Sequence, residues 1–281
     1  MCCRNAGRLE ARSGGELQMG SKWKNRIRTF RKYWDLLVEL VKRDIKLKYR
    51  RSVLGYIWSV LNPLLIMVVM TVVFSAMFKK NIENYPIYLL TGRVLFEFMR
   101  MATQNGLKSV TNNASLLKKT YIPKYIFTLS KVTSTMIDSV FSLGAFFIVM
   151  LATRSAFHWT MLYLVIIIIQ VYIFSLGLTF LLAALEVFFR DMEYIYHAFI
   201  TAWMYLTPLF YPIENLPHLL QVIIKGFNPM YYYIAAFRDI TLAGRMPGPR
   251  LVVGGWLWAF AALALGLYVF QKKKDEFILH I

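Results

Sequence analysis

The sequence has little charge and almost no cysteine. Only 17% of its 281 residues are charged, and 15 of these are acidic, whereas a soluble domain is about 25% charged. This deficit argues against a cytosolic globular protein. The two cysteines, Cys2 and Cys3, are adjacent near the N-terminus, so they form neither a disulfide framework nor a metal site.

Motifs of the common catalytic classes are missing as well. No G-x-x-x-x-G-K-[ST] segment occurs, so the chain has no phosphate-cradling loop with which to hydrolyse ATP. The four histidines lack the H-E-x-x-H spacing, and there is no G-x-S-x-G turn. Acidic residues inside apolar segments (Glu97, Asp138 and Glu186) are scattered rather than paired. We therefore expect a chain that is not an enzyme by itself and that holds no cofactor or metal.

What the sequence does have is apolar residues, at 58% of the chain, and a net charge of +18. On a soluble protein such a charge would indicate a nucleic-acid partner. Here the basic residues flank long apolar runs, which favours an anionic membrane surface and no nucleic acid.

Six segments are candidates to cross the membrane, since a spanning helix needs roughly 20 mostly apolar residues. They are Val53–Phe78, Pro86–Met101, Tyr125–Thr153, Trp159–Phe189, Tyr194–Tyr211 and Leu251–Phe270. Lys and Arg are more frequent in the flanks that would be cytoplasmic. We predict an all-α integral membrane protein with six transmembrane helices and both termini in the cytoplasm.

Two segments outside these spans are organised differently. Residues 1–32 form a polar, basic leader without the apolar run of a signal peptide. Residues 33–51 are amphipathic, with apolar side chains at spacings of three and four and basic ones between them. This pattern predicts a helix in the membrane interface, its apolar face on the lipid and its basic face toward phosphate headgroups. The transmembrane domain then covers residues 52–281.

Two connections between the predicted spans are informative. Asn112–Lys124 reads N-N-A-S-L-L-K-K-T-Y-I-P-K, a short basic helix ended by Pro123. It is either an amphipathic connector or a docking knob for a soluble partner. Pro212–Arg250 is apolar but broken by proline and glycine, with short helices expected around Leu216–Lys225 and Tyr231–Ala243. They are too short to span, which favours helices that dip into the outer leaflet or cover a channel mouth.

The second predicted span carries three charges on one helical face, Arg93, Glu97 and Arg100. Charges at membrane depth cost several kcal/mol unless they are paired or in water. Two interpretations remain open. Either the face lines an aqueous path, or this end of the helix lies at the outer headgroups.

Five segments in order resemble the membrane subunit (permease) of ABC-2-type transporters that export cell-surface polysaccharides such as O-antigen, capsule and teichoic acid. They are R-D-I-K-L-K-Y-R-R-S-V-L-G-Y-I-W (Arg43–Trp58), N-N-A-S-L-L-K-K-T-Y-I-P (Asn112–Pro123), F-R-D-M-E (Phe189–Glu193), P-L-F-Y-P (Pro208–Pro212) and N-P-M-Y (Asn228–Tyr231). The resemblance extends from Tyr33 to the C-terminus, but the charges of the second span replace an aromatic cluster that the family often has there.

The resemblance implies a homodimer in the bacterial cytoplasmic (inner) membrane, assembled with two ABC ATPase subunits that hold ATP and Mg. The cargo would be a glycan or polyol-phosphate linked to undecaprenyl pyrophosphate. The connection helix would couple the chain to the ATPase through Ser115, Leu116, Leu117, Lys118, Lys119 and Thr120. The short helices between spans five and six would form an external gate.

Two further groups of residues are expected to meet the cargo. Arg43, Lys46, Lys48, Arg50 and Arg51 are placed to hold the pyrophosphate, although the positive-inside rule explains the same charges. Phe74, Trp203, Tyr205, Phe210 and Tyr211 are the aromatic residues expected in a channel or gate, the alternative being an interfacial belt. Competing functions are export of a drug or small lipid by the same fold, and a polytopic glycosyltransferase acting on a polyprenyl lipid.

Overall fold

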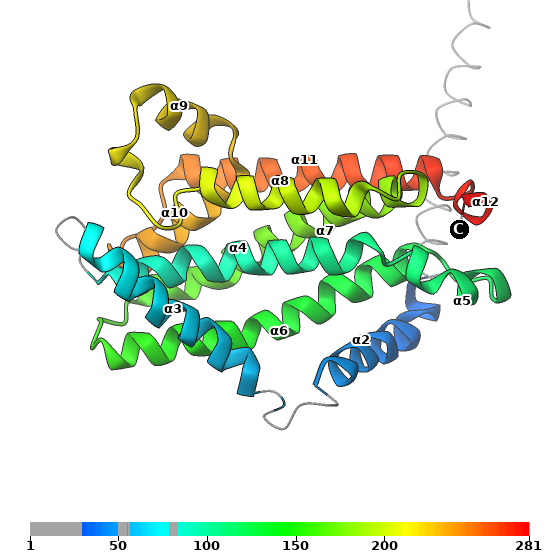
Figure 1. Ribbon diagram of the computed structural model, residues 1–281, viewed down its shortest axis with the longest axis horizontal. Helices are drawn as coiled ribbons and strands as arrows, with labels where there is room; N and C mark the ends of the chain where they lie inside the picture. Colours follow the sequence, from blue (N-terminus) through cyan, green and yellow to red (C-terminus); the bar gives the residue numbers. More distant parts are fainter. Residues whose placement is uncertain (1–29, 50–54, 56, 79–83, 281) are drawn as a thin grey trace, which may run out of the picture.

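The computed structural model describes residues 30–49, 55, 57–78 and 84–280, which contain helices and no strand (Figure 1). The helices are α2 (Trp34–Tyr49), α3 (Ile57–Phe78), α4 (Tyr85–Leu107), α5 (Ala114–Lys119), α6 (Tyr125–Ala152), α7 (Leu164–Phe188), α8 (Met192–Leu206), α9 (His218–Phe227), α10 (Pro229–Thr241), α11 (Pro249–Lys273) and α12 (Phe277–His280). Short 3₁₀ turns are η1 (Thr111–Asn113), η2 (Trp159–Tyr163) and η3 (Ile213–Asn215). The all-helical class that the sequence predicts is confirmed for these residues.

The long helices lie side by side, and successive ones run in opposite directions between two ends of the bundle (Figure 1). Helices α5 and α12 lie at one end, whereas α9 and α10 lie at the other. The fold thus separates the connection with the predicted docking helix from the broken segment before the last long helix.

Three helical segments are long and apolar enough to cross a membrane: Tyr125–Ala152, Trp159–Phe188 and Pro249–Lys273. The other predicted spans meet the requirement less well. Helix α4 carries three charges, and α8 has 15 residues. In α3, the apolar stretch found among the described side chains, Val60–Val73, is shorter than a spanning helix. At about 1.5 Å per residue, α8 is roughly 22 Å long, less than the roughly 30 Å of hydrocarbon. Six spans therefore stay a prediction, with three of them supported by length and apolarity.

The interior contains two hydrophobic clusters. The larger joins α4, α6, α7 and α10 and includes the fully buried rings of Phe96, Phe146, Tyr233 and Phe237. The smaller lies near α5 and α12 and includes Leu117, Phe127, Phe180, Phe270 and Phe277. The larger cluster extends along the whole of α4, from Tyr85 to Leu107, whereas the smaller one lies at the end of the bundle that carries α5 and α12.

Helices α7 and α11 approach closely because each has a glycine at the contact. A Cβ atom added to Gly266 would lie 1.9 Å from the carbonyl oxygen of Gly177. No side chain fits there, so the two backbones touch, as in small-residue contacts between membrane helices.

Helix α2 occupies the predicted amphipathic segment, but its orientation corrects the expectation. Leu37, Leu40 and Val41 are buried in the smaller cluster, together with Ile126 and Phe127 of α6. Much of the apolar face therefore packs on the protein instead of the lipid. The reason is that α6 presents an apolar surface to it; Trp34 and Leu47 remain exposed on other sides.

Candidate functional site

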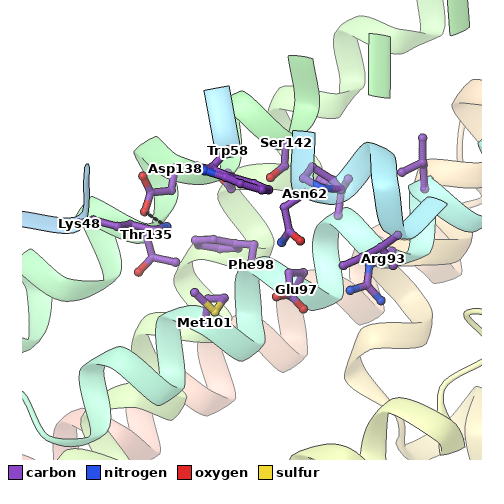
Figure 2. A pocket seen from close by; sticks show the side chains of 15 residues that line it. Lys48, Trp58, Asn62, Arg93, Glu97, Phe98, Met101, Thr135, Asp138 and Ser142 are labelled. Carbon is purple, nitrogen blue, oxygen red and sulfur yellow. Dashed lines mark hydrogen bonds and ion pairs between the residues drawn. The ribbon is translucent and has the colours of Figure 1, made fainter. Parts of the chain in front are cut away.

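A cavity of about 290 Å³ lies between α3, α4 and α6, beside the end of α2 (Figure 2). Each helix contributes residues from one face, at spacings of three or four. The polar or aromatic lining residues are Lys48, Trp58, Asn62, Arg93, Glu97, Phe98, Thr135, Asp138, Ser139 and Ser142. The structure thus brings together two groups that the sequence treats separately, the basic residues of α2 and the charges of α4.

The two carboxylates of this cavity lie far from the helix ends. Glu97 is near the middle of α4 (Tyr85–Leu107), and Asp138 is near the middle of α6 (Tyr125–Ala152). Carboxylates at this depth need a cation or water. Glu97 is paired with Arg100 at 2.5 Å, and Asp138 with Lys48 at 2.7 Å.

The polar face of α4 continues beyond the cavity. Arg100 also donates to Gln104 (2.7 Å), which lies 3.2 Å from His197 of α8. One turn further, Lys108 is paired with Glu193 at 2.5 Å, and the Glu193 carboxylate raises the pKa of Lys108. A polar track therefore follows α4 from the cavity toward the end of the bundle that carries α5.

Helix α2 is held on α6 by two ion pairs of opposite sense. Asp44 of α2 pairs with Lys131 of α6 at 3.0 Å, and Lys48 of α2 pairs with Asp138 of α6 at 2.7 Å. Each helix supplies one cation and one carboxylate, so only one register satisfies both pairs. The Asp44 side chain is only 8% exposed, which makes its partner important.

Replacing Lys131 by Met is expected to loosen α2, because the buried Asp44 carboxylate loses its cation on α6 and keeps only Arg43 of its own helix, at 3.3 Å. The expected loss of stability is about 1–3 kcal/mol, measured by thermal unfolding and by protease cleavage before α2. The double substitution Asp44→Lys with Lys131→Asp should restore most of the lost stability. Lys42→Met is the control, since Lys42 and Glu39 form an exposed pair; an equal loss in this control would contradict the proposed role of the pair.

Some of the basic residues that the sequence predicts to hold the pyrophosphate are already paired with carboxylates. Lys48 is engaged by Asp138, and Arg43 contacts Asp44 of the same helix at 3.3 Å. Lys46 is exposed. Arg50 and Arg51 lie outside the described residues.

The predicted coupling residues fall on α5 and its C-terminal end. Leu117 is buried and anchors the helix in the smaller cluster, whereas Leu116 on the neighbouring position is 36% exposed. Ser115, Lys118, Lys119 and Thr120 are also exposed, and Tyr121 is fully exposed. Helix α12 lies beside α5 and adds the exposed Ile278 and Leu279. The arrangement is an apolar and basic surface at one end of the bundle.

The predicted channel aromatics take different positions. Phe210 is buried, and Trp203 packs edge-on against Phe96 and Phe174. Only Tyr205 is well exposed, while the Tyr211 hydroxyl donates to the Tyr205 carbonyl at 2.7 Å. The side chain of Phe74 lies outside the described residues. Trp203 and Phe210 therefore contribute to packing within one chain.

The broken segment forms α9 and α10, and its polar groups are tied to α4 and α8. Asn228 caps α10 by accepting from the Met230 amide, and it also accepts from Trp203 (3.0 Å) and donates to Thr207 (2.9 Å). Arg238 of α10 donates to the carbonyls of Pro208 (2.8 Å) and Leu209 (3.0 Å). These contacts hold the P-L-F-Y-P turn against α10.

Sequence reasoning missed several of these residues. Lys131 and Asp138 lie inside a long apolar segment, where a charge is itself a signal of function or of a partner. Arg238 gives a similar signal in an apolar stretch, and its guanidinium also lies 3.5 Å from the Tyr88 ring centre. Asn62 has no comparable signal, because a single amide in an apolar helix does not indicate its neighbours.

The family model described as ABC-2 type transporter matches residues 35–242. The O-antigen export system permease protein RfbA of Myxococcus xanthus is 29% identical over 258 residues, 89% of this chain and 97% of its own length. RfbA of Klebsiella pneumoniae is 29% identical over 246 residues, 87% and 94% of the two chains. The capsule polysaccharide export inner-membrane protein CtrC of Neisseria meningitidis serogroup B is 24% identical over 189 residues, 65% and 70%.

Proposed function

Because the chain belongs to the ABC-2 type transporter membrane family, we propose that it is the membrane permease of a polysaccharide exporter, driven by ATP hydrolysis in a separate subunit. The observation that carries this proposal is similarity along nearly the whole chain to permeases of O-antigen export. The cargo is an O-antigen-like or capsule-like polysaccharide.

The surface around α5 supports an ATPase partner. The chain has no P-loop of its own, so a motor must bind from outside. Helix α5 exposes Leu116, and Tyr121 beyond its C-terminal end is also exposed, while Leu117 fixes the helix to the bundle. A short helix anchored in this way transmits a push from a soluble subunit to α4 and α6, between which it lies in the sequence. The assembly would hold two copies of this chain and two ATPase subunits in the bacterial cytoplasmic membrane, with both termini inside.

The polar face of α4 supports passage of a hydrophilic cargo. Glu97 and Arg100 lie well inside the helix, which favours the aqueous path over a position at the outer headgroups. The cargo would reach the permease on an undecaprenyl-pyrophosphate carrier, with a polyol-phosphate such as teichoic acid as the less favoured variant. Arg43 and Lys46, at the surface of α2, are candidates to hold the pyrophosphate together with Arg50 and Arg51.

The alternative of a polyprenyl-lipid glycosyltransferase requires acidic residues that act on a sugar. Glu97 and Asp138 do line one cavity. Each is already held in an ion pair, Glu97 with Arg100 and Asp138 with Lys48. The alternative of a drug or small-lipid exporter would not need the polar face of α4.

Co-expression with the P-loop ATPase encoded beside the gene tests the proposed function. We expect the two proteins to co-purify, with ATPase activity coupled to this chain only in the complex. Deletion of the gene should remove the surface polysaccharide, and a plasmid copy should restore it. Normal surface polysaccharide in the deletion strain, or failure to bind any ATPase, would contradict the proposal.

A further inference from the structure

The cavity between α3, α4 and α6 is lined by aromatic rings as well as by polar side chains. Trp58 of α3 and Phe98 of α4 supply aromatic rings, and Figure 2 shows both beside the Asn62 amide. Trp58 lies in the first turn of α3 and is 44% exposed. The face of an aromatic ring is electron-rich, so it attracts the weakly positive C–H groups on one side of a sugar ring.

Three polar side chains from three helices have open hydrogen-bonding capacity in this cavity. Arg93 of α4, Asn62 of α3 and Ser142 of α6 line it, and none makes a side-chain hydrogen bond to another described residue. An Arg at membrane depth without an acceptor is costly, so these groups need water or a ligand. Together they donate and accept hydrogen bonds, as sugar hydroxyls also do.

The charge of the cavity favours a neutral ligand over a phosphate. Its lining holds two cations, Lys48 and Arg93, and two carboxylates, Glu97 and Asp138, which cancel. Lys48 is already engaged by Asp138, and Arg100 holds Glu97 from outside the cavity. A phosphate bound to Arg93 would meet two carboxylates, whereas a polyhydroxyl ligand uses carboxylates as acceptors.

The volume of the cavity fits a single sugar residue of a polysaccharide. At about 290 Å³, the cavity is at the lower end of the roughly 300–1,000 Å³ of small-molecule sites. It therefore accommodates a single sugar residue with some water, and not a folded length of polysaccharide.

We propose that this cavity is a carbohydrate subsite, in which Trp58 and Phe98 contact the faces of one sugar residue of the cargo while Asn62, Arg93 and Ser142 bond its hydroxyls. The proposal rests on the proposed polysaccharide-export function and adds a binding site within each protomer. Because its walls are α3, α4 and α6 and its rim is Lys48 of α2, occupancy holds these four helices together.

Site-specific photocrosslinking in the polysaccharide-producing cell tests the subsite directly. A benzoylphenylalanine replaces Ile66, which lines the cavity, or Val69, which is on α3 but 59% exposed and outside it. The probe is the cell's own glycan, detected on the permease with a glycan-specific antibody. We expect a glycan adduct from position 66 and none above background from position 69. Phospholipid adducts alone at position 66, no adduct there, or equal glycan adducts at both positions would overturn the subsite.

Asn62→Leu provides a second measurement that does not depend on the crosslinker. It keeps the branched shape and the number of heavy atoms of the side chain but removes the amide, and the export rate should fall about fivefold, the factor expected for one lost hydrogen bond. Val69→Leu is the matched control and should export normally, with both variants retaining the ATPase partner. If deletion of the gene stops export but Asn62→Leu does not slow it, the subsite is wrong while the proposed function stands. If deletion leaves export intact, the proposed function itself fails.

Discussion

Replacing Leu116 by Asp is expected to abolish export and to release the ATPase subunit, while the chain still inserts into the membrane. Leu116 is exposed on α5, so the change alters a surface and leaves the interior intact. A carboxylate buried in an apolar contact costs several kcal/mol, enough to reduce binding by more than about a hundredfold. Co-purification of the ATPase and the amount of surface polysaccharide measure the effect.

A substitution at the adjacent Leu117 distinguishes an effect on folding from an effect on ATPase docking. Its side chain is buried in the smaller cluster with Phe127 and Phe277, so Leu117→Ala should destabilise the chain by about 2–4 kcal/mol. We expect a lower melting temperature for Leu117→Ala and an unchanged one for Leu116→Asp. A Leu116→Asp variant that retains the ATPase and exports normally would show that α5 is only a connector.

Replacing Arg238 by Met is expected to unfasten the turn between α8 and η3 from α10. Arg238 donates to the carbonyls of Pro208 and Leu209 and stacks on Tyr88. Methionine fills part of the volume but donates nothing, so these carbonyls lose their partner at a cost of about 2–4 kcal/mol. The melting temperature of the purified complex should fall by about 5–10 °C, and export should fall with it.

Lysine at position 238 tests whether the turn is stabilised by the positive charge of Arg238 or by the planar geometry of its guanidinium. An ammonium group keeps the charge but lacks the planar fork that reaches two carbonyls at once, so Arg238→Lys should recover little of the stability. Arg245→Met is the control, because Arg245 is mostly exposed and pairs with Asp239, a kind of pair that contributes about 1 kcal/mol or less. Full stability in Arg238→Met would mean that the turn is held by its apolar contacts alone.

The charges of α4 illustrate where sequence reasoning reached its limit. The spacing of Arg93, Glu97 and Arg100 correctly predicts one helical face, and the structure pairs Glu97 with Arg100. The sequence left open whether this face is inside the membrane domain or at its edge. The helix bounds, Tyr85 and Leu107, place Glu97 near the helix centre, which favours an interior position.

For the predicted coupling residues, too, the sequence predicts the helix but not which side of it faces the interior. Composition and the proline at position 123 predict a short basic helix between two long ones, and α5 lies there. Periodicity over six residues is too short to tell which leucine faces inward. That orientation depends on Phe127 and Phe277, the second of which lies near the other end of the chain.

Local information in the sequence determined the helical class, the absence of a P-loop and the positions of the long apolar segments, because hydropathy and motif spacing involve neighbouring residues. Only the tertiary structure decided that α2 packs on α6, that Lys48 meets Asp138 90 positions away, and that Trp58, Asn62, Arg93 and Ser142 line one cavity. The physical reason is that an ion pair or a cavity depends on how helices pack, and packing is set by the shape and charge of side chains from distant segments.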